Sequence, residues 1–210
     1  MFVRRQSQDN LFQIQDAAAF ISRDLCALLM KKLYKHDPAV YRHSIRVALL
    51  SKSVAEVMGL DPAQQTVFFR SALLHDIGKL TISAEWLRGK TTSLDRARQL
   101  EQHPEAGAEL LEDFIAHGLV MPEVILHHHE NLDGSGYPFG KTERDLTLPV
   151  RIVRVADSYD ADVYCPGNSG FASDKDALND LYRWSDICYD AEVVKVFHAI
   201  LRRRGREPQW

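Results

Sequence analysis

Apolar residues recur three or four positions apart over most of the chain, which is the spacing of one buried face on a helix. No stretch shows sustained alternation of apolar and polar residues, so strands are not indicated. We therefore predict an all-α helical bundle. Its helices are expected within residues 11–33, 37–59, 61–75, 92–102, 103–118, 122–130, 149–161, 174–184 and 191–203.

Proline and glycine mark several of the predicted helix ends. Asp37-Pro38 and Asp61-Pro62 each open a helix, because proline in the first turn costs no hydrogen bond. The first of these helices is predicted to end at Gly59 and to bury a stripe of five apolar residues. Gly78 is predicted to end the second helix. The buried stripe comprises Val40, Val47, Leu50, Val54 and Val57.

The length of 210 residues suits one large domain with a helical preface. We place the preface at residues 1–36 and the domain at 37–210. The preface carries no recognisable chemistry, and packing on the domain, dimerisation and a signalling helix all stay open. A possible homodimer or signalling partner is therefore part of the hypothesis.

Charge and cysteine content narrow the class of protein. A formal net charge of -3 argues against binding to a DNA or RNA polymer, which needs a concentrated basic face. The three cysteines lie far apart, which favours neither a zinc knuckle nor a disulfide framework. The N-terminus lacks an apolar signal core and no apolar run could span a bilayer, so we expect a soluble cytoplasmic protein without a membrane span.

An adjacent His75-Asp76 pair follows the second apolar run, and Lys79 comes shortly after it. Imidazole nitrogen and carboxylate oxygen together suit a divalent transition metal, and an adjacent pair can serve a two-metal site. Lys79 could meet an anion beyond the helix end. The dipeptide alone is weak evidence, because most such pairs are surface or capping residues.

Further ligand-type side chains repeat along the chain at a regular distance. Each falls on a different predicted helix, and neighbours are roughly 25 to 32 residues apart, the span of one helix and one connection. In a bundle, side chains at one height can converge on a metal site. Four histidines and two aspartates exceed what one tetrahedral ion needs and suit two ions that act on a phosphate ester. The set is His43, His75, Asp76, His103, His128 and Asp157.

Residues 128–138, HHENLDGSGYP, resemble the HHExxDGxGYP signature of the HD-GYP family of bacterial phosphodiesterases that hydrolyse cyclic di-GMP. HSIRV at 43–47, HDIGK at 75–79, HPEAG at 103–107 and RIVRVADSYDA at 151–161 extend the resemblance over residues 37 to 162. It implies an HD-domain helical bundle with a metal centre in its core.

The resemblance also implies roles for particular residues. The six side chains named above would bind two divalent metals, iron or manganese, and His129 would be a further ligand or lie beside the site. Asp76 and Lys79 would be catalytic, with Lys79 meeting the scissile phosphate. Tyr137 would sit at the mouth of the site and contact the substrate, cyclic di-GMP or a related cyclic dinucleotide.

Two departures from the family pattern limit what is carried over. Some members hold a third metal with a Glu four residues before the first histidine, and this chain has Ala39 there, so we expect two metals. Members usually carry an Arg-Pro-Tyr stretch after the DSYDA segment, whereas here residues 162–168 read DVYCPGN. Lys175 could substitute for the missing arginine.

Two alternatives to cyclic di-GMP hydrolysis stay open. The chain could be a signalling or interaction module that keeps the fold and metals but turns over little. It could also hydrolyse another cyclic dinucleotide or phosphate ester.

Overall fold

The computed structural model describes residues 25–88, 94–164, 173–203 and 205. The described residues contain helices and connections but no strand, apart from two isolated bridges. The all-α prediction is confirmed. The elements are α2 (Pro38–Val57), α3 (Pro62–Leu74), η1 (Ile77–Thr81), α4 (Ala84–Arg88), α5 (Leu94–Glu101), α6 (His103–Leu110), α7 (Glu112–Ala116), α8 (Pro122–His127), η2 (Glu143–Asp145), α9 (Leu148–Tyr164), α11 (Asp174–Arg183) and α12 (Ala191–Arg203).

Both predicted aspartate-proline helix starts are observed. The Asp37 carboxylate accepts from the backbone N–H groups of Ala39 at 2.7 Å and Val40 at 3.2 Å, and Asp61 caps α3 in the same way. These bonds satisfy donors that the first helical turn leaves without partners.

The end of α2 differs from the prediction at Val57, whose side chain is 57% exposed instead of buried. The helix ends at this residue and the chain turns at Gly59, where φ is +76°. Leu60, after the turn, is the residue that enters the core. The predicted buried stripe of this helix therefore extends one turn too far.

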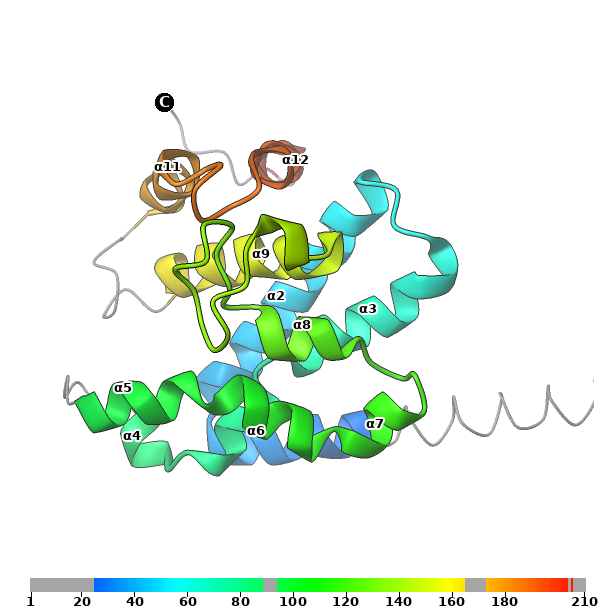
Figure 1. Cartoon of the computed structure of the whole chain (residues 1–210), viewed down its shortest axis with the longest axis vertical. Helices are drawn as coiled ribbons and strands as arrows, with labels where there is room; N and C mark the ends of the chain where they lie inside the picture. Colours follow the sequence, from blue (N-terminus) through cyan, green and yellow to red (C-terminus); the bar gives the residue numbers. More distant parts are fainter. Residues whose placement is uncertain (1–24, 89–93, 165–172, 204, 206–210) are drawn as a thin grey trace, which may run out of the picture.

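The helices lie in three groups along the molecule. Figure 1 shows α11 and α12 at one end, α4 to α7 at the other, and α2, α3, α8 and α9 between them. α2 packs against both α3 and α9, and α6 packs against η1 and α8. The long helices α2 and α9 thus form the framework on which the other elements are arranged.

Two apolar clusters fill the interior. The larger joins buried residues of α2, α9, α11 and α12. The smaller includes Leu33, Leu74, Ile77 and Ile125. Leu74 and Ile77 flank His75 and Asp76 in the chain, so that pair is fixed to the smaller cluster on both sides.

Residues 25–36 are helical and contribute Met30 and Leu33 to the smaller cluster. The rest of the predicted preface lies outside the described residues. The division at residue 36 stays a prediction.

Within the described part of the chain, the helices are all too short or too polar to cross a bilayer.

Candidate metal centre

His75 and Asp76 do not precede a glycine helix end as predicted. α3 ends at Leu74, and Gly78 lies inside the short 3₁₀ helix η1. A Cβ atom on Gly78 would be 1.9 Å from the backbone oxygen of His103. Gly78 is therefore required for the close approach of η1 to α6, and the prediction that it ends the helix is wrong.

Five separate parts of the fold bring the predicted ligand residues together. His43 comes from α2, His103 from the first residue of α6, and Asp157 from α9. The remaining residues follow the ends of α3 and α8, where the backbone leaves the helix. All of them are buried except His129, which is half-buried. The converging set is His43, His75, Asp76, His103, His128, His129 and Asp157.

One group of ligand atoms surrounds the first oxygen of the Asp76 carboxylate. His103 Nε2 lies 3.2 Å from Asp76 Oδ1, and His128 Nε2 lies 3.9 Å from the same atom. The two imidazole nitrogens are 3.1 Å apart. His129 completes this group, whose ligand atoms all lie within 4.8 Å of one another.

A second group lies on the other side of the same carboxylate. Asp76 Oδ2 is 3.5 Å from Nε2 of both His43 and His75. Asp157 Oδ1 is 3.0 Å from His43 Nε2 and 3.6 Å from His75 Nε2. Asp76 thus faces both groups, so its two carboxylate oxygens would be available to metal held by either one.

Backbone carbonyl oxygens hold three of the imidazoles in the orientation that metal binding requires. The Nδ1 atoms of His75, His103 and His128 lie 2.8, 2.5 and 2.9 Å from the oxygens of Ala72, Leu100 and Ile125. A carbonyl oxygen can only accept, so each Nδ1 carries the proton and each Nε2 presents a lone pair to the centre. Such outer contacts are typical of metal-binding histidines.

Two atoms of the centre have no hydrogen-bond partner within the described structure. These are His75 Nε2 and Asp76 Oδ1, both completely buried. A buried acceptor without a partner costs on the order of 1–3 kcal/mol, which a bound cation would offset. Nitrogen and carboxylate donors suit divalent transition metals, so these residues fit a divalent metal site.

The electrostatics of the centre keep its carboxylates ionised. Burial opposes the charged form of Asp76, but the ammonium of Lys79, 2.6 Å from Oδ2, and the neighbouring histidines hold its pKa well below the usual value. For His43, burial lowers the pKa, but the carboxylates of Asp157 and Asp160 together raise it to about 9.

Burial and the neighbouring imidazoles lower the pKa values of His128 and His129 well below the usual range. Both rings are therefore neutral at physiological pH. A neutral imidazole is the form that binds a metal.

Asp160 was not predicted from the sequence, although it is fully buried beside the centre. Its Oδ2 atom lies 2.8 Å from His43 Nδ1, and Arg46 donates to both of its oxygens at 2.6 and 2.7 Å. Asp160 follows Asp157 by three residues on α9, which places both on the same helix face. That spacing was the available signal.

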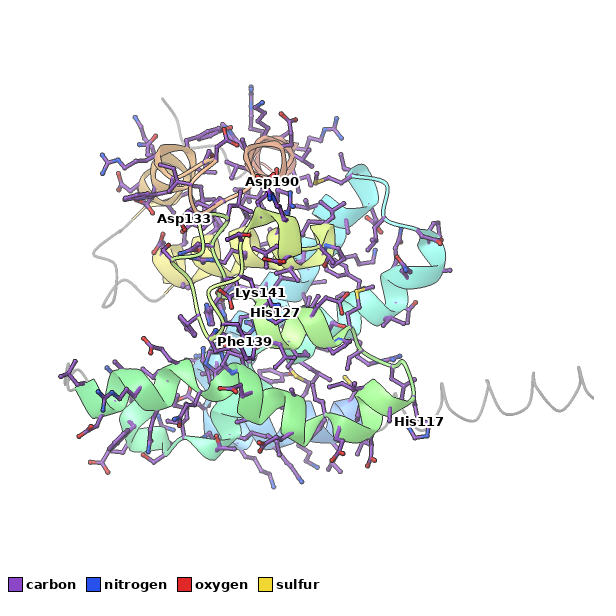
Figure 2. The ribbon with its side chains drawn as sticks, viewed as in Figure 1. His117, His127, Asp133, Phe139, Lys141 and Asp190 are labelled. Carbon is purple, nitrogen blue, oxygen red and sulfur yellow. The ribbon has the colours of Figure 1, made fainter. Side chains whose placement is uncertain are left out.

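Glu130 is a second residue that the sequence analysis missed. It is 1% exposed, and its carboxylate accepts from the backbone N–H groups of Phe139 at 2.8 Å and Lys141 at 3.0 Å. Figure 2 shows Phe139 and Lys141 close to His127 at the end of α8. Glu130 therefore fastens the loop that carries Tyr137 to the end of α8.

Tyr137 stacks on the ring of His129, with centroids 4.7 Å apart. Both residues line a cavity of about 390 Å³ that also reaches His43, Asp76, Lys79 and ten other residues. This volume lies within the range of small-molecule sites. Lys79 and Tyr137 are thus placed where a ligand at the centre would contact them.

The remaining sequence interpretations concern residues away from the centre. His127 faces away from the ligand group and packs edge-on against Phe139. The altered segment after Asp162 falls largely on residues 165–172, outside the described residues.

The family model for the HD domain matches residues 27–193. A cyclic di-GMP phosphodiesterase of Pseudomonas aeruginosa is 35% identical over 152 residues, which are 70% of this chain and 36% of that protein. A 3′3′-cGAMP-specific phosphodiesterase of Vibrio cholerae is 35% identical over 123 residues, 58% of this chain and 28% of that protein. The chain spans less than half the length of either relative.

The fold is also that of a solved HD-GYP-type protein from Bdellovibrio bacteriovorus, with a TM-score of 0.63 and 22% identity over 76% of this chain and 51% of that one. The likeness in structure supports the fold alone. The family model, together with the signature at 128–138, identifies this chain as a member of the HD domain family, of the HD-GYP type.

Proposed function

We propose that the chain is a metal-dependent phosphodiesterase that hydrolyses cyclic di-GMP to linear pGpG, with GMP as a candidate end product. The observation that carries the proposal is the convergence of five histidines around two aspartates, in which His75 Nε2 and Asp76 Oδ1 have no hydrogen-bond partner among the described residues. The named activities of the relatives support the same substrate class.

The two groups of ligand atoms support two divalent ions in this proposal, and the resemblance to the HD-GYP family favours iron or manganese. His103, His128 and His129 would hold one ion and His43, His75 and Asp157 the other, with Asp76 between them. When bound, the ions supply an activated water and neutralise charge on the phosphate. The number and identity of the ions belong to the proposal.

The chain's own residues would position the substrate and balance its charge. The Lys79 ammonium lies at the cavity wall beside Asp76, where it can attract a phosphate oxygen. Tyr137 offers an aromatic face and a hydroxyl near the same point. Hydrolysis adds water across the bond between phosphorus and a 3′ oxygen, which leaves a 5′ phosphate and a free 3′ hydroxyl.

A mixed cyclic dinucleotide is a second candidate substrate. Relatives in Vibrio cholerae that are 34–35% identical to this chain are named for hydrolysis of 3′3′-cGAMP. This substrate has the same sugar-phosphate ring, so the proposed chemistry at the metal centre is unchanged.

The test is anaerobic purification, metal quantification, and incubation of the same sample with cyclic di-GMP and with 3′3′-cGAMP, followed by chromatography of the products. About two metals per chain and a linear product from cyclic di-GMP are expected. Faster turnover of 3′3′-cGAMP would favour the second candidate.

Normal metal content without hydrolysis of either dinucleotide would overturn the enzymatic proposal. A binding or signalling module would then be the better description. Binding of a protein partner that survives His75→Ala would support that description.

A further inference from the structure

The cavity beside the metal centre extends away from it, toward the beginning of α2 and the helices α4 and α5. Its wall there includes Val40, Leu87 and Leu100, and Arg88 and Arg96 lie on the same side. Among the described residues that line it, the cationic side chains are therefore Lys79 at the metal end and two arginines from α4 and α5. This distribution suits a ligand with negative charge at two separate points.

Arg88 is held in place at the wall by the cap of α2. Its Nε donates to Asp37 Oδ2 at 3.1 Å, and one Nη donates to the backbone oxygen of His36 at 3.1 Å. These bonds use two of the five N–H donors of a guanidinium. The side chain is 62% exposed, so its other donors can reach a ligand in the cavity.

The carboxylate of Asp37 binds Arg88 on one side and the beginning of α2 on the other. Asp37 is 3% exposed, and its other carboxylate oxygen already accepts from two backbone N–H groups of α2. Burial opposes its charge, but these donors and Arg88 lower the pKa of Asp37. The carboxylate therefore serves mainly as an anchor that aims the guanidinium.

Arg96 has a different position in the same wall. It donates to the backbone oxygens of Trp86 at 2.6 Å and Leu87 at 3.5 Å, which ties α5 to α4. We therefore regard Arg96 as support for the wall and Arg88 as the residue that contacts the ligand.

Helix geometry separates the residue that anchors Arg88 from the nearest metal-ligand candidate on the same helix. Asp37, which anchors Arg88, precedes His43 by six residues, about 9 Å along the axis of α2. A single small phosphate at the metal centre would not span this distance. A cyclic dinucleotide carries two phosphodiesters on opposite sides of its ring, and its second phosphodiester would point away from the ions.

We propose that Arg88 is a substrate-binding residue that contacts the distal phosphodiester of a cyclic dinucleotide, the one that is not being hydrolysed. This proposal rests on the proposed function. It makes Arg88 a specificity-determining residue, since substrates with a single phosphodiester gain nothing from it.

The test compares Arg88→Ala with Arg88→Lys and with Arg98→Ala, the matched control. Arg98 lies on α5, is exposed and does not line the cavity. Each metal-loaded variant is assayed with cyclic di-GMP and with bis(p-nitrophenyl) phosphate, a small diester with one phosphate. Loss of this partly exposed ion pair should move the melting temperature by no more than about 4 °C, and a shift of this size verifies folding.

For Arg88→Ala we expect KM for cyclic di-GMP to rise about 10- to 100-fold, the loss of a charge-assisted hydrogen bond, with kcat nearly unchanged. Activity on the small diester should not change, Arg88→Lys should restore part of the affinity, and Arg98→Ala should match the wild type. An equal loss on both substrates, or no loss on either, would overturn the proposal.

Cyclic di-AMP distinguishes a phosphate contact from a contact with a guanine edge. If Arg88→Ala weakens cyclic di-GMP but not cyclic di-AMP, Arg88 reads the base and the phosphate assignment is wrong. Calorimetric binding of cyclic di-GMP to the metal-loaded protein separates the two proposals. Binding without turnover would contradict the proposed function, whereas undiminished binding by Arg88→Ala would contradict the role of Arg88.

Discussion

The apolar cluster around α9 and the polar metal centre share the helices α2 and α9, yet they differ in whether their buried atoms find partners. Buried core residues such as Val153 and Phe197 belong to one apolar cluster, and their side chains carry no polar atom that needs a partner. In the centre, His75 Nε2 and Asp76 Oδ1 are buried polar atoms without a hydrogen-bond partner among the described residues. The comparison teaches that the first region is complete as folded and the second is built for something added.

The largest expected effect comes from Asp76→Asn, because this carboxylate faces both ligand groups. Changes to groups behind metal ligands cost about 10- to 100-fold, so loss of the central ligand should lower kcat/KM by more than about 100-fold. Metal content measured by mass spectrometry should fall in parallel. A variant that kept its metals and its activity would contradict the assignment of Asp76.

The apolar region is tested by Phe197→Ala. Phe197 is completely buried and its ring lies 5.0 Å from that of Tyr159. Removing it should lower the free energy of unfolding by about 3–5 kcal/mol, measured by urea denaturation. Leu49→Ala is the control, since Leu49 is on α2 and 47% exposed, and should change stability by less than about 0.5 kcal/mol.

Added metal sharpens the comparison between the two regions. Divalent metal at about 100 times its dissociation constant should stabilise the wild type by about 2.7 kcal/mol, because it binds only the folded chain. Metal should raise the free energy of unfolding of Phe197→Ala by the same amount, although this variant is less stable without metal. Metal should raise that of Asp76→Asn only slightly. Equal gains in all three proteins would show that the metal acts elsewhere.

A smaller effect is expected from Asp160→Asn. The change keeps the shape but weakens the bonds to His43 Nδ1 and to Arg46. Metal affinity should fall about 10- to 100-fold, measured by competition with a chelator, while stability without metal changes less. Glu56→Gln, on the exposed part of α2, should leave metal affinity unchanged. Unaltered affinity in Asp160→Asn would mean that His43 does not depend on this support.

The smallest effect is expected from Glu130→Gln, since glutamine still offers one acceptor to the two backbone donors of Phe139 and Lys141. Replacing charge-assisted hydrogen bonds by weaker ones should cost about 1 kcal/mol in stability. KM for cyclic di-GMP should rise more than kcat falls, because the loop carries Tyr137 and not the metal ligands. A loss of bound metal would instead show that Glu130 supports the centre itself.

Regular spacing allowed much of the centre to be predicted from the sequence. His43, His103 and Asp157 each occupy one helix, and the chain returns to the same level after each helix and connection. The helix starts at Pro38 and Pro62 followed from local chemistry that needs no tertiary information.

Contacts between distant residues could not be predicted in this way. Asp160 meets His43 across 117 positions, and Arg88 meets Asp37 across 51. The spacing of Asp160 from Asp157 marks its helix face but not its partner, because each pairing depends on how α9 or α4 docks on α2. The prediction that Val57 is buried was wrong for a related reason. Periodicity alone does not show where the helices that cover α2 end.

Gly78 fixes the distance between η1 and α6. With a Cβ position only 1.9 Å from the oxygen of His103, even alanine would force η1 and α6 apart. That displacement would separate Asp76 from His103, whose Oδ1 and Nε2 atoms lie 3.2 Å apart. The absence of one methyl group therefore sets the spacing of Asp76 and His103, and this position should accept no other residue, although glycine has no side chain that could bind metal or substrate.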